Sequence, residues 1–129
     1  MSGCLVTVSH ACNDGRMIEA EVVRAFVAWL ECEGWSVRTE VGFIDVVAER
    51  DGLTLLAEAK GTTASAGLDV DTAYGQLLRR INLGRDGERY ALVVPASAGK
   101  AVERVGRDLR SLLRIELYVV ADDGTVILV

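Results

Sequence analysis

The stretch FIDVVAER-DG-LTLLAEAK, residues 43–60, decides the fold. Two runs rich in apolar and β-branched residues flank Asp51-Gly52. Asp-Gly in this position is a strong hairpin signal, because a type I′ turn needs positive φ at both central residues. The register that follows from this turn places Asp45 directly opposite Glu58. Lys60 is expected on the same face of the sheet, because side chains two residues apart on a strand point the same way.

The predicted pairing of Asp45 with Glu58 needs a physical reason. Directly opposed residues have Cβ atoms about 5 Å apart, and like charges at that distance destabilise a sheet. A cation between the two carboxylates removes the repulsion. Two hard oxygen ligands beside a lysine suit Mg²⁺ or Mn²⁺. The hairpin therefore predicts a divalent metal site. The same register places Phe43 opposite Lys60.

A helix is predicted over residues 16–33, where apolar side chains recur every three or four positions and Gly34 follows as the terminator. Glu19 falls on the apolar stripe of this helix, and Glu21 falls on its polar side. A carboxylate on an inward face requires compensation. Either Glu19 lies beside the metal site, or it stabilises the first turn through the helix dipole.

Further along the chain, a second helix is predicted over residues 71–83, with Gln76 beside its buried stripe and Arg79 and Arg80 toward the open face. A third helix is predicted over residues 99–114. Its buried positions are expected to be Val102, Val105, Leu109, Leu112 and Leu113. Its opposite side carries the basic residues Lys100, Arg104, Arg107 and Arg114. This stripe is either a solvated face or a track that contacts phosphates.

The remaining strands are predicted over residues 35–41, 89–94, 116–121 and 125–129, with a short strand at residues 5–8. The last strand is strongly apolar. At a sheet edge it must be covered or paired, and pairing with a second copy of the chain is one solution. A homodimer is therefore one expected assembly.

Length and composition favour one soluble domain over residues 1–129, because half of the residues are apolar and the chain has one proline. The net charge is −5, which does not by itself indicate nucleic-acid binding. The acidic excess lies within residues 1–60, which carry the proposed metal ligands, and a divalent ion would offset part of it. No segment suggests a membrane span or a signal peptide, so a cytoplasmic location is expected. The three cysteines (Cys4, Cys12 and Cys32) are expected to be free thiols.

Asp45 followed after twelve residues by Glu58-Ala59-Lys60 resembles the motif of the PD-(D/E)xK nuclease superfamily. The resemblance covers most of the chain, since a glutamate-bearing helix precedes the hairpin and a helix with Gln76 follows it. Ile44 occupies the position where the family name has proline. The resemblance implies an α/β, restriction-endonuclease-like fold, in which helices flank a mixed central sheet. The expected order is α-β-β-β-α-β-α-β with an extra C-terminal strand.

The resemblance also implies roles for individual residues. Asp45, Glu58 and the backbone carbonyl of Ala59 would hold Mg²⁺ or Mn²⁺. Lys60 would stabilise charge or position the attacking water, because nearby carboxylates oppose the lowered pKa that a general base requires. Glu19 would bind a second metal or a water attached to the metal, and Gln76 would position water or phosphate.

The substrate would be contacted from the helix and loop that follow the motif. Tyr74 and Arg79 are candidates on the helix, and Thr62 and Thr63 are candidates in the loop over residues 61–67. The predicted function is metal-dependent hydrolysis of nucleic-acid phosphodiester bonds, with DNA expected before RNA. Small single-domain members that resemble this chain include junction resolvases and Mrr-like nucleases.

Three other functions remain open at this point. The chain could be a non-catalytic protein-interaction module that keeps the nuclease fold, which the acidic net charge favours. It could be a nuclease subunit that cuts only when a basic partner supplies nucleic-acid binding. It could also hydrolyse a different phosphate ester. The intact set of Asp45, Glu58 and Lys60 favours a catalytic function over the first alternative.

Overall fold

The structure, a computed structural model, describes residues 16–129, so the short strand predicted at residues 5–8 lies outside the described residues. The elements are α1 (Glu19–Cys32), β1 (Ser36–Val41), β2 (Ile44–Arg50), β3 (Leu53–Ala59), α2 (Ala66–Leu78), β4 (Glu88–Pro95), the 3₁₀ turn η1 (Ala96–Ala98), α3 (Gly99–Val102), α4 (Arg107–Leu112), β5 (Ile115–Val120) and β6 (Val126–Leu128). This order confirms the predicted arrangement of helices and strands, with the third helix divided.

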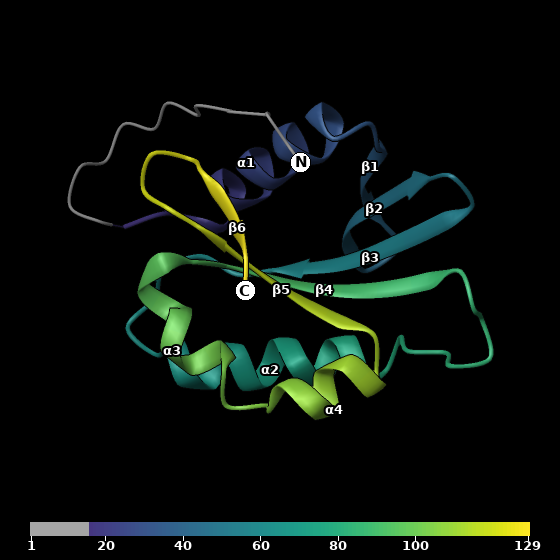
Figure 1. Ribbon diagram of the computed structural model, residues 1–129. Helices are drawn as coiled ribbons and strands as arrows, with labels where there is room; N and C mark the ends of the chain where they lie inside the picture. The colour runs from purple at the N-terminus through teal and green to yellow at the C-terminus, as the bar shows by residue number, and fades with distance from the viewer. Residues whose placement is uncertain (1–15) are drawn as a thin grey trace.

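The six strands form one mixed sheet in the order β1-β2-β3-β4-β5-β6. Strand β3 pairs in parallel with β4, and β4 pairs in parallel with β5. The other pairings are antiparallel. Helix α1 covers one face of the sheet, and helices α2, α3 and α4 cover the other (Figure 1). This three-layer arrangement confirms the prediction of a central sheet that is covered on both faces.

Each face of the sheet packs its own hydrophobic core. Phe26 of α1 lies in one core with Ala57 and Ala59 of β3. Tyr74 of α2 lies in the other core. Side chains alternate along a strand, so Glu58, between the two alanines, points toward the face that α2 covers. The carboxylate of Glu58, near the end of the second strand of the hairpin, therefore points toward the layer that contains α2.

The predicted continuous helix over residues 99–114 is wrong. The chain forms the separate segments η1, α3 and α4, because Gly106 adopts an extended conformation with ψ of 152°. This break changes the helical phase, so different side chains face the core. Leu109 and Leu112 are 50% and 70% exposed instead of buried. Arg110 is buried in their place, and its Nε donates a hydrogen bond to the carbonyl of Val105 at 3.0 Å.

The basic stripe predicted on that helix is also interrupted. Arg104 forms an ion pair with Asp71 at 3.4 Å. Arg114 lies 3.9 Å from Asp86, and its guanidinium donates hydrogen bonds to two backbone carbonyls. The guanidinium groups of Arg104 and Arg114 are thus engaged in contacts within the protein. These contacts favour a solvated, structural face over a surface that binds phosphates.

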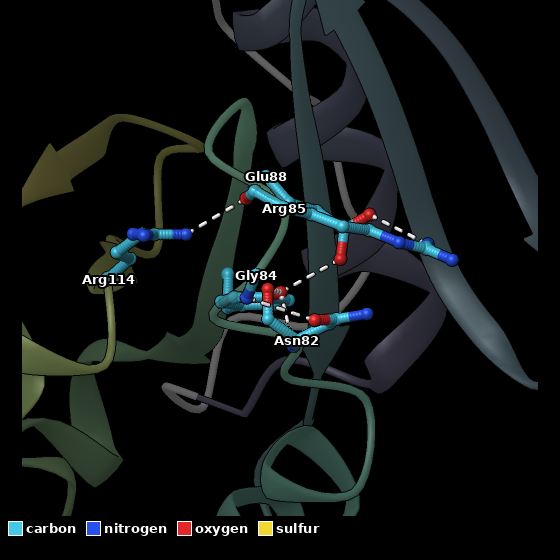
Figure 2. Close-up of polar contacts among 6 residues, drawn as sticks. Asn82, Gly84, Arg85, Glu88 and Arg114 are labelled. Atoms are coloured by element: carbon cyan, nitrogen blue, oxygen red, sulfur yellow. Dashed lines mark hydrogen bonds and ion pairs between the residues drawn. The ribbon is translucent and has the colours of Figure 1, made fainter.

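Helix α2 begins at Ala66, five residues earlier than predicted, and ends at Leu78. A polar network then fixes the connection to β4 (Figure 2). The hydroxyl of Tyr90 donates a hydrogen bond to the buried carboxylate of Glu88 at 2.8 Å and accepts one from the backbone N–H of Asn82 at 2.7 Å. Arg114 donates to the carbonyl of Arg85 at 2.9 Å. This network holds the chain segment that follows the proposed site.

Two further observations concern the wider predictions. Cys32, the last residue of α1, is disulfide-bonded, which contradicts the expectation of a free thiol at this position. Within residues 16–129, no helix combines the length and apolar character that crossing a membrane requires.

Candidate functional site

The candidate site is centred on Asp45 and Glu58, at the end of the β2-β3 pairing. The observed register pairs Val46 with Ala57, so the next residues outward are the two carboxylates, as predicted. Oδ2 of Asp45 accepts a hydrogen bond from the backbone N–H of Ala59 at 2.8 Å. Glu58 is only 3% exposed. The hairpin therefore holds one fixed carboxylate against one buried carboxylate.

The electrostatics of Glu58 reflect this crowding. Burial raises the pKa of its carboxyl group above the ordinary value, and the charge of Asp45 raises that pKa further. A hydrogen bond between the two carboxyl groups acts in the same direction, whereas Arg80 lowers the pKa. A buried carboxyl group whose pKa is raised by a neighbouring carboxylate has the electrostatic character of a site suited to a cation.

Arg80 is the residue that the sequence prediction missed. It was expected toward the open face, but its side chain is 26% exposed and its Nε lies 3.2 Å from Oε1 of Glu58. Its Nη2 donates a hydrogen bond to the backbone carbonyl of Phe43 at 2.9 Å. The signal was available in principle, since a buried carboxylate requires an ion-pair or hydrogen-bond partner. The side of α2 on which that partner would lie was not evident from the sequence.

The predicted pairing of Phe43 with Lys60 does not form. Phe43 lies in the turn between β1 and β2, because β2 begins at Ile44. The backbone N–H of Lys60 donates to the carbonyl of Val93 at 3.0 Å, which continues the pairing with β4. The charge of Lys60 lowers the pKa of Glu19. Lys60 therefore lies close enough to Glu19 to interact with it electrostatically.

The two glutamates at the start of α1 exchange their predicted environments. Glu21 is buried, at 7% exposure, and its Oε1 accepts a hydrogen bond from the backbone N–H of Ile18 at 3.1 Å. This contact caps the helix, which explains why a carboxylate is buried there. Glu19 is exposed. Partial burial and the charge of Asp45 raise its pKa. The structure therefore brings Glu19 toward Asp45 from the opposite layer.

Close packing between α1 and the loop after β3 fixes this approach. A Cβ atom added to Gly61 would lie 2.4 Å from the backbone nitrogen of Glu19, so only glycine fits without a shift. Next to it, the backbone N–H of Thr62 donates to the carbonyl of Met17 at 2.7 Å, and its Oγ1 accepts from the N–H of Met17 at 3.0 Å. The loop therefore positions Glu19 relative to Lys60.

Asp45 lines two cavities. The larger has a volume of about 850 Å³, and it is lined by Glu40, Gly42, Phe43, Ile44, Asp45, Gln76, Arg79 and Arg80. The smaller, of about 230 Å³, is lined by Glu19, Ala20, Val23, Thr39, Glu40 and Asp45. Oε1 of Gln76 is buried and has no hydrogen-bond partner among residues 16–129. An unsatisfied buried amide beside a cavity is suited to hold water or a ligand.

Three predicted substrate contacts have other partners. The hydroxyl of Tyr74 is buried and donates to the carbonyl of Val102 at 2.5 Å, so this side chain belongs to the core rather than to the cavity. Thr62 holds the loop to the chain before α1. Thr63 donates a hydrogen bond to the carboxylate of Asp69 at the start of α2. Of the proposed substrate-binding set, Arg79 lines the large cavity.

The donor set fits one kind of metal site better than another. No group of three or more histidine, cysteine or acidic side chains within the described range is arranged to hold a metal ion. A closed zinc site would require such a group. Mg²⁺, by contrast, is bound by one or two carboxylates, with water and substrate phosphate completing an octahedral shell. Asp45 lines an open cavity and lies opposite Glu58, and two carboxylates so placed match the second kind of site better than the first.

No protein-family model matches the chain, and no curated protein matches it. Two solved structures share its fold with a TM-score of 0.58 and 18% sequence identity. One is an XisH family protein from Nostoc punctiforme PCC 73102, over 83% of this chain and 96% of that one. The other is an fdxN element excision controlling factor protein from Anabaena variabilis, over 84% and 96%. The similarity confirms the predicted α/β fold class, in which helices flank a mixed central sheet.

Proposed function

We propose that this protein is a metal-dependent nuclease that hydrolyses phosphodiester bonds, with DNA as the expected substrate. The observation that carries the proposal is the pairing of Asp45, which lines a cavity of about 850 Å³, with the buried carboxylate of Glu58. Such a pair is destabilising without a cation and suits Mg²⁺ or Mn²⁺ when one is bound.

The site residues divide the chemistry between them. Asp45 and Glu58, with the carbonyl of Ala59, would hold Mg²⁺ or Mn²⁺. When bound, the ion would polarise the scissile phosphate and lower the pKa of a coordinated water. The hydrogen bond from the N–H of Ala59 fixes the orientation of Asp45, so this ligand is already in place before the ion arrives. Such preorganisation reduces the cost of assembling the site.

The surrounding polar groups would act on the water and the phosphate. Lys60, whose charge lowers the pKa of Glu19, would stabilise the negative charge that develops on the phosphate. Glu19 would hold a second ion or orient the water. The unpaired Oε1 of Gln76 would accept a hydrogen bond from water in the large cavity. The smaller cavity joins Glu19 to Asp45 on the other side.

A second function is favoured by one specific observation. Arg80 already neutralises Glu58, so the fold does not need a metal to compensate this buried charge. The protein would then act without cutting, or it would cut only with a partner that supplies nucleic-acid binding. One solved neighbour is described as an excision controlling factor, which is compatible with a regulatory function. This alternative predicts weak or absent cleavage by the isolated chain.

A cleavage assay separates the two functions. We would incubate the protein with single-stranded, duplex, flap and four-way-junction DNA and with RNA, in Mg²⁺, in Mn²⁺ and in EDTA. The informative variants are Glu58→Ala and Lys60→Ala. The matched control is Glu49→Ala, because Glu49 lies on the same hairpin but is exposed and pairs with Arg38 at 3.1 Å.

The proposed nuclease predicts cleavage that requires the metal, disappears in Glu58→Ala and Lys60→Ala, and persists in Glu49→Ala. Cleavage that survives both site substitutions would point to a contaminating nuclease and would refute the proposed mechanism. Absence of cleavage on every substrate, together with Mn²⁺ binding by calorimetry, would favour the partner-dependent function. Absence of both would favour the interaction module.

A further inference from the structure

Phe43 occupies an unusual position for a large aromatic side chain. It is 90% exposed at the tip of the β1-β2 hairpin. The turn itself does not demand an aromatic residue there. Gly42, with φ of +63°, supplies the positive φ that a two-residue hairpin turn requires at its first central position. The exposed ring therefore calls for an explanation outside the packing of this chain.

The surroundings of Phe43 identify the chemistry that it faces. Phe43 lines the cavity of about 850 Å³ together with Arg79 and Arg80, which follow the last residue of α2. Arg80 donates to the carbonyl of Phe43 at 2.9 Å and so ties the hairpin tip to the helix end. Arg79 is exposed, and its side chain makes no hydrogen bond or ion pair with any residue of the described range. The same cavity is thus lined by a residue with an exposed aromatic ring and by a guanidinium that is available for an anion.

We propose that this cavity binds one unpaired nucleotide of a nucleic-acid strand. The base would stack on Phe43, and Arg79 would contact the phosphate. Aromatic stacking with an arginine contact is how single strands are bound without sequence preference, because every base has a π-face. A base inside a duplex is already stacked on its neighbours and cannot present that face. The substrate class is therefore a single strand or the frayed or branched part of a duplex.

This inference rests on the proposed function and narrows its substrate. The position of Asp45 supports the link, since the same carboxylate lines the cavity and forms the proposed metal site. A strand seated on Phe43 would pass its phosphate beside Asp45 and Glu58. The aromatic ring would then act as a positioning residue that selects unpaired nucleotides for the cleavage site.

The test measures binding in EDTA at low ionic strength, so that cleavage does not interfere. Fluorescence anisotropy would report the affinity for a labelled oligothymidine strand and for a duplex of equal length. The variants are Phe43→Ala, Phe43→Trp and Arg79→Gln. The control is Leu112→Ala, because Leu112 is 70% exposed but does not line the cavity. A strand with 2-aminopurine, a fluorescent base, would report stacking directly.

We expect Phe43→Ala to weaken single-strand affinity about tenfold, the range found when one base-stacking aromatic is removed. Phe43→Trp should retain the affinity and the quenching of 2-aminopurine, and Arg79→Gln should weaken binding and reduce its salt dependence. The Leu112 control should not change either quantity. Duplex affinity should be lower and insensitive to Phe43.

Several results would overturn the inference. One is a single-strand affinity that does not change in Phe43→Ala. Another is wild-type protein that binds no single strand. A third is a Phe43→Ala variant that changes only the sedimentation coefficient, which would assign the ring to a protein contact. Cleavage without Phe43-dependent binding would refute this inference and would still support the proposed nuclease. Phe43-dependent binding without cleavage would support this inference and contradict the proposal that the isolated protein is a nuclease.

Discussion

Replacement of Arg80 by glutamine tests the electrostatic core of the site. The substitution removes the guanidinium whose Nε lies 3.2 Å from Oε1 of Glu58. It also removes the donor to the carbonyl of Phe43 at 2.9 Å. Glu58 would remain buried beside Asp45 with two like charges and no compensating cation. We therefore expect Arg80→Gln to destabilise the metal-free protein.

The size of the effect follows from the burial of the two partners. Breaking a fully buried pair by removing one partner costs about 3–5 kcal/mol. The side chain of Glu58 is 4% exposed but that of Arg80 is 26% exposed, so water weakens the interaction. Hydrogen bonds to charged groups contribute about 1.5–3 kcal/mol. We expect a loss of about 2 kcal/mol, which corresponds to a drop in Tm of roughly 6–10 °C for a domain of this size.

Urea unfolding in EDTA would measure this loss in the single variants Arg80→Gln and Glu58→Gln and in the double variant. A double-mutant cycle over these proteins should give a coupling energy of about 1–2 kcal/mol. Arg79→Gln is the matched control, because Arg79 is adjacent and exposed, and we expect it to change stability by less than about 0.5 kcal/mol.

Added Mn²⁺ extends the same experiment to the proposed metal site. If the ion takes over the role of Arg80 beside Glu58, it should stabilise Arg80→Gln more than wild type. Equal stabilisation of wild type and Arg80→Gln by Mn²⁺ would show that the ion and the guanidinium do not occupy the same position. In the double-mutant cycle without metal, a coupling energy near zero would refute the argument that Arg80 compensates the charge of Glu58.

Two further predictions concern the packing that supports the site, and both are measured by urea unfolding. Gly61→Ala should lower the free energy of unfolding by about 1–3 kcal/mol, because the added Cβ would lie 2.4 Å from the backbone nitrogen of Glu19 in α1. Gly75→Ala, at a helical position with open space around it, should raise the free energy of unfolding by about 0.5–1 kcal/mol. Equal effects of the two substitutions would contradict the close approach at Gly61. Tyr90→Phe should lose about 1–3 kcal/mol because it removes the 2.8 Å hydrogen bond to the buried Glu88. Tyr118→Phe should lower the free energy of unfolding by less, since the hydroxyl of Tyr118 makes a longer hydrogen bond of 3.3 Å to the more accessible carboxylate of Glu116. The reverse ranking would contradict the contribution of the Tyr90–Glu88 network to stability.

The hairpin and its register were predictable because their signals are local. Asp-Gly between two apolar runs determines both the turn and the pairing, so the opposition of Asp45 and Glu58 followed from a few residues. The mixed sheet with helices on both faces followed from the order of the elements and from the apolar strands. These features do not depend on how the helices are oriented against the sheet.

The errors arose where tertiary packing decides the outcome. Periodicity favoured one helix over residues 99–114, but an extended conformation at Gly106 divides it and buries Arg110 instead of Leu109. The inward glutamate of α1 is Glu21 rather than Glu19, because a capping hydrogen bond to the backbone compensates its burial. Arg80 lies beyond the last residue of α2, so helical periodicity could not assign its direction.

The arrangement around Glu58 is difficult to explain by stability alone. A buried glutamate opposed to an aspartate carries a desolvation cost and a repulsion, and an apolar pair in the same position would stabilise the sheet more. The ion pair with Arg80 reduces this cost without removing it, since burial and Asp45 still raise the pKa of Glu58. Gln76, which lines the same cavity as Asp45, also has a buried oxygen without a hydrogen-bond partner among the described residues. Groups that lower stability in this way are characteristic of functional sites. These observations support the proposal that the Asp45–Glu58 pair is a preformed site for a cation, with Arg80 stabilising the fold before the cation binds.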